Sequence, residues 1–149
     1  MSTSTKVAAI VIAAVIVTAV AVIYIQSVTV HNVGTIRSVG VDIFTDATFT
    51  TQLKNINWGI MSPGDTKGVS AYLYNPGNVP IFCYFNTTNW SPIIAQQYIV
   101  PSWDYGNQTL NAGGNMHVNI YLYINASLVP SVGIANFTYD MTIYGQALS

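Results

Sequence analysis

Residues 118–125 read VNIYLYIN, and residues 136–143 read NFTYDMTI. In both segments an apolar side chain occupies every second position, which is the spacing that places alternate side chains on opposite faces of a β-strand. One face of each segment is therefore predicted to be buried, and the other is predicted to face solvent. These are the clearest strands in the chain, and they indicate an all-β fold.

The same alternation recurs in shorter segments, at residues 28–31, 39–43, 69–73 and 81–85. Segments rich in Pro, Gly and Asn separate the strands, at residues 62–65, 75–78, 106–107 and 112–115. Short strands joined by such turns predict an immunoglobulin-like antiparallel β-sandwich for residues 27–149. Only residues 91–97 are expected to form a helical turn within this domain.

The N-terminal part of the chain lacks this alternation. The nineteen residues from Val7 to Ile25 carry no charge, and a helix of that length would span about 30 Å, close to one bilayer core. Residues 1–26 are therefore predicted to form one apolar helix. It is compatible with a membrane anchor whose N-terminus, with Lys6, lies inside, with a cleaved secretory signal, or with a pilin-like helix in a filament core. Each role places the outer domain at the cell surface or outside the cell.

The composition excludes several classes of function. Only 6% of the residues are charged, the net charge is −1, and the four Lys and Arg residues are scattered. Nucleic-acid binding depends on clustered basic side chains, so it is not expected. A domain with so few titratable groups changes little in charge as the pH falls, and we therefore expect it to tolerate an acidic exterior.

The sequence contains no recognisable catalytic or metal-binding constellation. His31 and His117 stand alone, without the close spacing typical of zinc ligands. Asp42 and Asp46 are too few carboxylates for a calcium loop. Cys83 lies within an alternating strand and is predicted to be a buried apolar side chain. We therefore predict no catalytic residue, no metal and no cofactor, and we do not expect an enzyme.

Two other groups of residues need an interpretation, a pair of aspartates and a set of aromatic residues. Asp65 and Asp104 are predicted to accept hydrogen bonds from nearby backbone amides in turns. A carbohydrate-binding aromatic platform is an alternative that we keep open, since sugars stack on exposed rings. Its candidate residues are Trp58, Trp90, Tyr98, Trp103 and Tyr105.

Five Asn-x-Ser/Thr sequons are the strongest chemical signal, and all lie beyond the apolar segment. Their asparagines are Asn86, Asn89, Asn107, Asn125 and Asn136. Attached glycans would help to keep a surface with so few charges in solution. We expect two or three of the sequons to be occupied. Asn125 and Asn136 are expected to be the least accessible, because they lie at the ends of predicted strands.

Several turn-and-strand motifs together resemble a known group of surface proteins. The motifs lie at residues 56–59, 61–65, 74–80, 89–92 and 133–138, and they cover nearly all of the outer domain. They resemble archaeal surface proteins that are similar to the TasA/camelysin group of biofilm fibre subunits and to the archaeal bundling pilins. This resemblance implies donor-strand exchange, in which an N-terminal strand of one subunit completes the sheet of the next.

The donor strand would lie in residues 28–43, which join the apolar segment to the sandwich, although this segment can equally be the first strand of its own domain. The candidate donor residues are Val28, Val30, Ile36, Val39, Val41 and Ile43. The leading prediction is a structural subunit of a pilus or matrix fibre, assembled head to tail by strand exchange or helix packing. The alternative is a membrane-anchored monomeric ectodomain with a binding or adhesion role. The expected partners are copies of the chain, the membrane and attached glycans.

Overall fold

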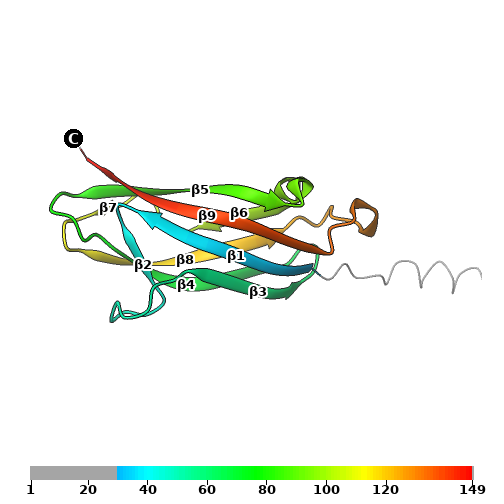
Figure 1. Cartoon of the computed structure of the whole chain (residues 1–149), viewed down its shortest axis with the longest axis horizontal. Helices are drawn as coiled ribbons and strands as arrows, with labels where there is room; N and C mark the ends of the chain where they lie inside the picture. Colours follow the sequence, from blue (N-terminus) through cyan, green and yellow to red (C-terminus); the bar gives the residue numbers. More distant parts are fainter. Residues whose placement is uncertain (1–29, 149) are drawn as a thin grey trace, which may run out of the picture.

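The computed structural model describes residues 30–148, which form two β-sheets stacked face to face (Figure 1). This confirms the expected all-β sandwich. The predicted apolar helix, including Val7–Ile25, lies outside the described residues. Within residues 30–148, no helix is long and apolar enough to cross a membrane.

The strand order of the five-stranded sheet is β3-β1-β9-β5-β7, and that of the four-stranded sheet is β2-β4-β8-β6. The elements are β1 (Val30–Val39), β2 (Asp42–Phe44), β3 (Asn55–Met61), β4 (Thr66–Tyr74), β5 (Ile81–Ser91), η1 (Ile93–Gln97), β6 (Ile99–Trp103), β7 (Thr109–Leu110), β8 (Asn115–Ile124), η2 (Pro130–Val132) and β9 (Asn136–Ala147). The helical turn expected at residues 91–97 is confirmed as the 3₁₀ turn η1.

The predicted faces of the clearest strands are the buried ones. In β8 and β9 every second side chain is buried, and these side chains belong to Val118, Ile120, Leu122, Ile124, Phe137, Tyr139, Met141 and Ile143. Cys83 is buried in β5, as its place in the alternation predicted. The core therefore lies between the two sheets, and β8 and β9 supply one wall each.

The single strand predicted over residues 39–43 is wrong. Gly40 has a φ of +70°, and a Cβ atom at this position would lie 2.8 Å from the carbonyl oxygen of Gly145. The chain turns a corner here and passes from β1 in one sheet to β2 in the other. Period-two alternation continues through the corner because Val41 and Ile43 also point into the core, so the sequence pattern hides the break.

The sandwich is also not purely antiparallel as expected. β1 pairs in parallel with β9 from His31 to Val39, although it pairs antiparallel with β3. Figure 1 shows β1 and β9 side by side along the length of the domain. This parallel pair joins the first strand of the domain to the last one.

The strand register defines two ends of the sandwich. His31 near the start of β1 pairs with Ile60 near the end of β3 and with Asn136 at the start of β9, and Ser91 of β5 pairs with Thr138. We call this end, where η1 and η2 also lie in Figure 1, the proximal end. The opposite, distal end carries the loops at residues 75–80 and 104–114 and the C-terminus.

A buried asparagine organises the distal end. Asn75 is 1% exposed, and its Nδ2 donates to the carbonyls of Val79 at 2.8 Å and Leu110 at 3.1 Å. Its Oδ1 accepts a hydrogen bond from the amide of Gly77. Asn75 thus ties the β4–β5 loop to β7, where no apolar side chain could satisfy these backbone groups.

Candidate functional site

The position filled by β1 is the candidate site, because β1 is the segment predicted to be a donor strand. β1 lies between β9 and β3, so both of its backbone edges are paired over much of its length. Beyond the pairing with β3, the amide of Ile36 donates to the carbonyl of Lys54 at 2.7 Å. We call the space between β3 and β9 the β1 slot.

An aromatic cluster forms the inner wall of the β1 slot. A Cβ atom on Gly34 of β1 would lie 3.2 Å from Cζ of Tyr139, so glycine is what allows this ring to lie beneath the strand. Trp90 of β5 stacks on Tyr139 with ring centroids 4.7 Å apart. The indole Nε1 of Trp58 donates to the Tyr139 hydroxyl at 3.2 Å. The cluster therefore links β3, β9 and β5 directly under β1.

Burial raises the pKa of Tyr139 to about 12, and the hydrogen bond from Trp58 only partly opposes this shift. The hydroxyl therefore stays protonated at any physiological pH, and the wall of the slot carries no charge.

The candidate donor residues do not lie on one strand. Ile36 is buried in β1, whereas Val41 is buried at the corner and Ile43 is buried in β2 of the other sheet. Val30 and Val39 are the first and last residues of β1, and Val28 lies outside the described residues. Within the described part of residues 28–43, only β1 therefore lies in the slot.

The outer edge of β3 is blocked by a lysine that points inward from the four-stranded sheet. Lys67 of β4 places its Nζ 2.7 Å from the carbonyl oxygens of both Trp58 and Ile60. Inward-pointing charged side chains are a recognised way to protect an edge strand from pairing with another chain. The Lys67 ammonium thus occupies acceptors that an added strand would need.

Replacing Lys67 with methionine is expected to expose this edge. Methionine keeps an apolar stem but has no ammonium, so two β3 carbonyls lose their donor and stability should fall by about 1–2 kcal/mol. We expect concentration-dependent association in light scattering with size-exclusion chromatography. Lys67→Arg retains hydrogen-bond donors, so its association should be the same as that of the parent protein. Equal association of the two variants would contradict this role for the ammonium.

The remaining edges are also unsuited to simple strand addition. β2 spans three residues and β7 two, and β6 contains Pro101, which has no amide hydrogen. β5 extends beyond its pairing with β7, but the amide of Cys83 donates to the Tyr105 hydroxyl and that of Thr87 donates to its neighbour Asn86. We therefore take the β1 slot, and not one of these edges, as the candidate site.

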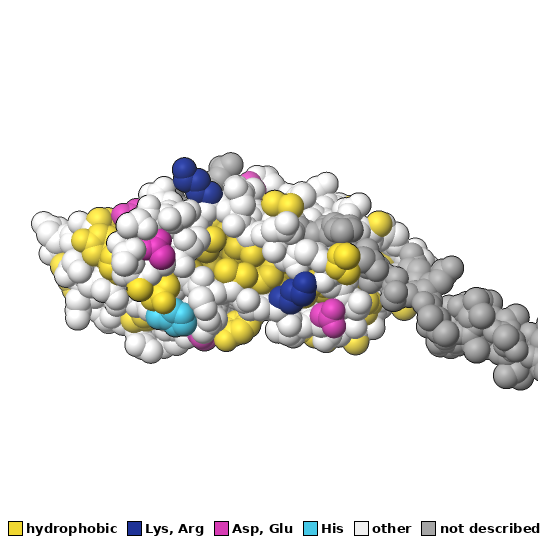
Figure 2. Space-filling view, turned by 90° about the horizontal axis from the view of Figure 1, so that it is seen from below, with side chains coloured by type: hydrophobic (Ala, Val, Ile, Leu, Met, Phe, Trp, Pro, Cys, Tyr) yellow, Lys and Arg dark blue, Asp and Glu magenta, His cyan; other side chains and the backbone are white. Residues whose placement is uncertain are grey.

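Charged groups are scattered on the surface. Figure 2, seen from below Figure 1 on the side of β3, shows a few Lys and Asp side chains on a largely uncharged surface. Among the described residues, no group of three His, Cys, Asp or Glu side chains could hold a metal ion. His117 packs its ring against Tyr72 with centroids 5.0 Å apart, and the side chain of His31 lies outside the described part of the chain.

The aspartates act as hydrogen-bond acceptors. Asp65 accepts from the amide of Ser62 at 2.7 Å, which confirms its predicted role in a turn. Asp104 instead reaches across to β8, where it accepts from the amide and the side chain of Asn119 at 2.7 Å each, and these bonds lower its pKa. The predicted hydrogen bond from a backbone amide is therefore present, but Asn119, which donates it, lies on β8 and not in the turn.

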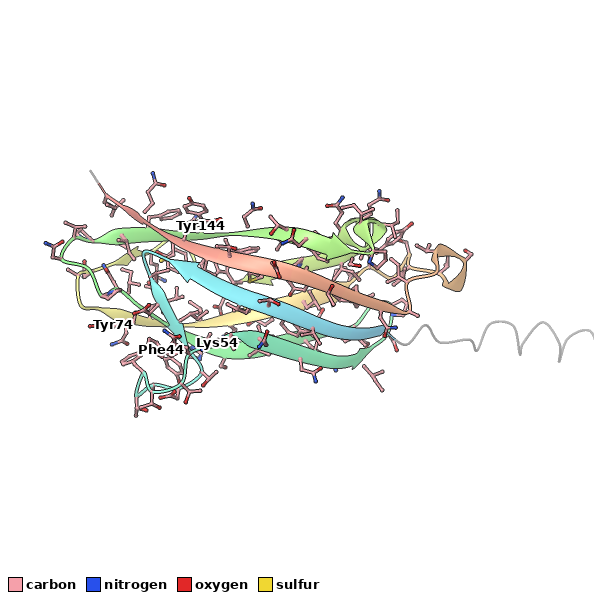
Figure 3. All side chains as sticks on the ribbon, in the orientation of Figure 1. Phe44, Lys54, Tyr74 and Tyr144 are labelled. Atoms are coloured by element: carbon pink, nitrogen blue, oxygen red, sulfur yellow. The ribbon has the colours of Figure 1, made fainter. Side chains whose placement is uncertain are left out.

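Asp46 accepts hydrogen bonds from three threonines of its own loop. Its Oδ1 accepts hydrogen bonds from the hydroxyls and amides of Thr48 and Thr50, and its Oδ2 accepts from the amide of Thr51 at 2.9 Å. The Thr48 hydroxyl first, and then the amides of Thr50 and Thr51, hold the pKa of this carboxyl far below its usual range. This network shapes the loop between β2 and β3, which Figure 3 shows next to the labelled Phe44 and Tyr74. The ring of Phe49 in the same loop packs against both of these rings. Its centroid lies 5.5 Å from that of Phe44 and 5.4 Å from that of Tyr74.

Because the pKa values of these two aspartates are lowered, we predict that acid destabilises the fold only at low pH. Above the unfolded-state pKa of about 4, the folded protein has the full stabilisation from Asp46 and Asp104. That stabilisation is lost as the pH falls through the lower folded-state pKa values. We expect the urea midpoint to stay nearly constant from pH 7 to about pH 4 and to decrease below it. The Asp46→Asn/Asp104→Asn double variant should show a smaller decrease, and a strong decline of the parent midpoint already above pH 5 would contradict the prediction.

The sequons differ in accessibility. Asn86, Asn107 and Asn136 are exposed, so the expectation that Asn136 is occluded is wrong. Nδ2 of Asn89, the atom that would carry a sugar, donates to Asp140 at 2.7 Å. Asn125 is half-buried and accepts a hydrogen bond from the amide of Ser127.

The five aromatic residues considered for sugar binding do not form an exposed platform. Trp58 and Tyr105 are buried, and Trp90, Tyr98 and Trp103 are half-buried against the core. Their rings are used for packing between the sheets.

Comparison with known proteins identifies no family. No protein-family model matches the chain, and no curated protein matches it. Among solved structures, the chain is similar to the ASH/PapD-like domain 7 of human CEP192, with 10% identity and a TM-score of 0.27, over 58% of this chain and 76% of that one. A likeness at this level carries no argument about function. The resemblance to TasA/camelysin subunits and archaeal bundling pilins stays a prediction.

Proposed function

We propose that the chain is a structural subunit of an extracellular pilus or matrix fibre. Its immunoglobulin-like sandwich would follow an N-terminal apolar helix and lie outside the cell. The observation that carries the proposal is the position of β1, which continues directly from the apolar segment and yet is an inner strand of the five-stranded sheet. A strand that is first in the chain and central in the sheet is suited to exchange between copies.

Strand exchange would replace each contact of β1 with the same contact from a neighbouring copy. Removing β1 would leave unpaired backbone on both β9 and β3 and would uncover Tyr139, so an empty slot would strongly favour a new strand. The chain would have to open at the corner at Gly40 for β1 to leave its own domain, and the pairing of β1 with β3 and β9 would have to break. If each copy donates to the next, the contact does not close and a fibre forms.

Disulfide trapping in the full chain tests the exchange. Thr35 and Asn55 are register partners on the outer face of β1 and β3, and a Cys83→Ala background removes the only native thiol. In the Thr35→Cys/Asn55→Cys variant, fibres oxidised after assembly should give a ladder of covalent multimers on non-reducing gels. Monomers that never assembled should give an internal bridge instead.

The matched control pairs two strands that belong to the same copy in either arrangement. Tyr84→Cys/Tyr144→Cys joins β5 to β9 at register partners and should give only internal bridges. If assembled fibres of the Thr35→Cys/Asn55→Cys variant also contain only internal bridges, strand exchange of β1 is excluded. If electron microscopy of the cell surface finds no fibres that contain this chain, the fibre proposal itself fails.

A membrane-anchored ectodomain is the second candidate, and it is favoured by the apolar side chains exposed at the proximal end. The mass of the mature N-terminus separates the two, because an intact anchor begins near Met1 whereas a processed subunit is shorter. In either case we propose that Asn86, Asn107 and Asn136 are the sequons that carry glycans, since their side chains are exposed. Glycopeptide mapping tests this assignment.

A further inference from the structure

We propose that the proximal end of the sandwich is a membrane-contacting surface, which inserts aliphatic side chains into the bilayer interface beside the apolar segment. From the large aliphatic side chains exposed toward this end, we select three and call them the apolar rim. They are Ile60 (57% exposed), Ile93 (66%) and Val129 (47%). The inference rests on the second candidate function, in which residues 7–25 form a membrane anchor.

The strand register shows that the rim residues share one end although they come from separate elements. Ile60 pairs with His31 near the start of β1. Ile93 follows two residues after Ser91, which pairs with Thr138 near the start of β9, and Val129 lies just before η2 in the loop leading into β9. Figure 1 shows η1 and η2 at the same end as the start of β1.

Two of the loops around the rim carry no charge. Residues 91–99 and 125–136 contain no Asp, Glu, Lys or Arg, whereas the loops after β2 and β6 contain Asp46, Lys54 and Asp104. The charged groups in the turn and strand near Ile60 are already bound, since Asp65 accepts from the Ser62 amide and Lys67 donates to β3 carbonyls. No ionised group in these two loops would therefore have to enter the interface, where desolvation is costly.

The short tether brings this end to the membrane. Only residues 26–29 separate Ile25 from Val30, and the five Cα-to-Cα steps from Ile25 to Val30 extend at most about 18 Å. The headgroup region of one leaflet is about 5–8 Å thick. With residues 7–25 in the bilayer, the proximal end cannot be far from the lipid surface, and the rim is the part of the domain that faces it.

Fluorescence quenching in the full chain tests the contact. Single-cysteine variants in a Cys83→Ala background, reconstituted in phosphatidylcholine vesicles, would carry an environment-sensitive dye at Ile93→Cys, Val129→Cys or Val79→Cys. Val79 is the control, because it is a similarly exposed aliphatic residue (44%) in the distal loop between β4 and β5. Nitroxide-labelled lipids should quench the dye at residues 93 and 129 at least twofold more than the dye at residue 79.

A label within the apolar segment separates the two proposals. If the dye at Ile16→Cys is quenched by lipid but residues 93 and 129 behave like residue 79, the rim does not contact the membrane and this inference fails alone. If the dye at residue 16 is not quenched, the proposed membrane placement fails as well. If the dyes at residues 93 and 129 are shielded from solvent only in lipid-free fibres, the rim contacts a second copy of the chain. That result would overturn the lipid contact.

Discussion

Asn75→Ala is expected to lower the free energy of unfolding by about 3–4 kcal/mol, because each buried polar group left unpaired costs about 1–3 kcal/mol. The substitution removes the donors to the carbonyls of Val79 and Leu110 and the acceptor of the Gly77 amide. Alanine is too small to replace them, and the fully buried position limits access of water. Urea denaturation at neutral pH measures the loss.

The neighbouring Asn78 provides the control for this prediction. It lies in the same loop but is exposed, so Asn78→Ala should change stability by less than about 0.5 kcal/mol. The loss in Asn75→Ala should come with faster hydrogen exchange in the loops at residues 75–80 and 110–114. Similar stability of the two variants would show that the hydrogen bonds of Asn75 do not hold the distal end together.

Gly145→Ala is expected to destabilise the domain by about 3 kcal/mol, at the upper end of the usual cost of overpacking. A Cβ atom at this position would lie 2.5 Å from the carbonyl oxygen of Gly40 and 2.7 Å from Cδ1 of Ile81. The first contact is with backbone at the corner between β1 and β2, so the corner itself would have to move. Thermal and urea unfolding both report the change.

The same variant connects stability with the proposed exchange of β1. Displacing the corner should loosen the end of β1, so we expect Gly145→Ala to form strand-exchanged multimers more readily than the parent protein. Gln146→Ala, at the exposed neighbouring position, should leave both stability and assembly unchanged. A Gly145→Ala protein with parental stability would mean that the corner adapts without strain.

The strands were predictable from the sequence because their signal is local. Alternation in residues 118–124 and 137–143 requires only that one face be buried, and the turns at Ser62–Asp65 and Asn75–Asn78 have the residue types that tight turns need. The burial of Cys83 followed from the same alternation. These features do not depend on which strands are neighbours.

The pairing of the strands was not predictable, because it depends on contacts between distant residues. Alternation is the same for parallel and antiparallel strands, so β1 and β9 gave no sign of their parallel pairing. The corner at Gly40 was hidden because apolar residues occupy both sides of it. The role of Lys67 was also missed, although a lone lysine at an inward position of an alternating strand was a usable signal. The sequence marks Asn75 only as a turn residue, because its hydrogen bond to Leu110 joins positions that are far apart in the chain.

The parallel pairing of β1 with β9 has a mechanical consequence. β1 begins at the proximal end and β9 finishes at the distal end, so tension applied between the two termini pulls these neighbours in opposite directions along their length. Their hydrogen bonds are then loaded together in shear and must rupture as a group, whereas strands pulled apart from one end open one bond at a time. The domain should therefore resist stretching along its long axis far better than its modest size would indicate.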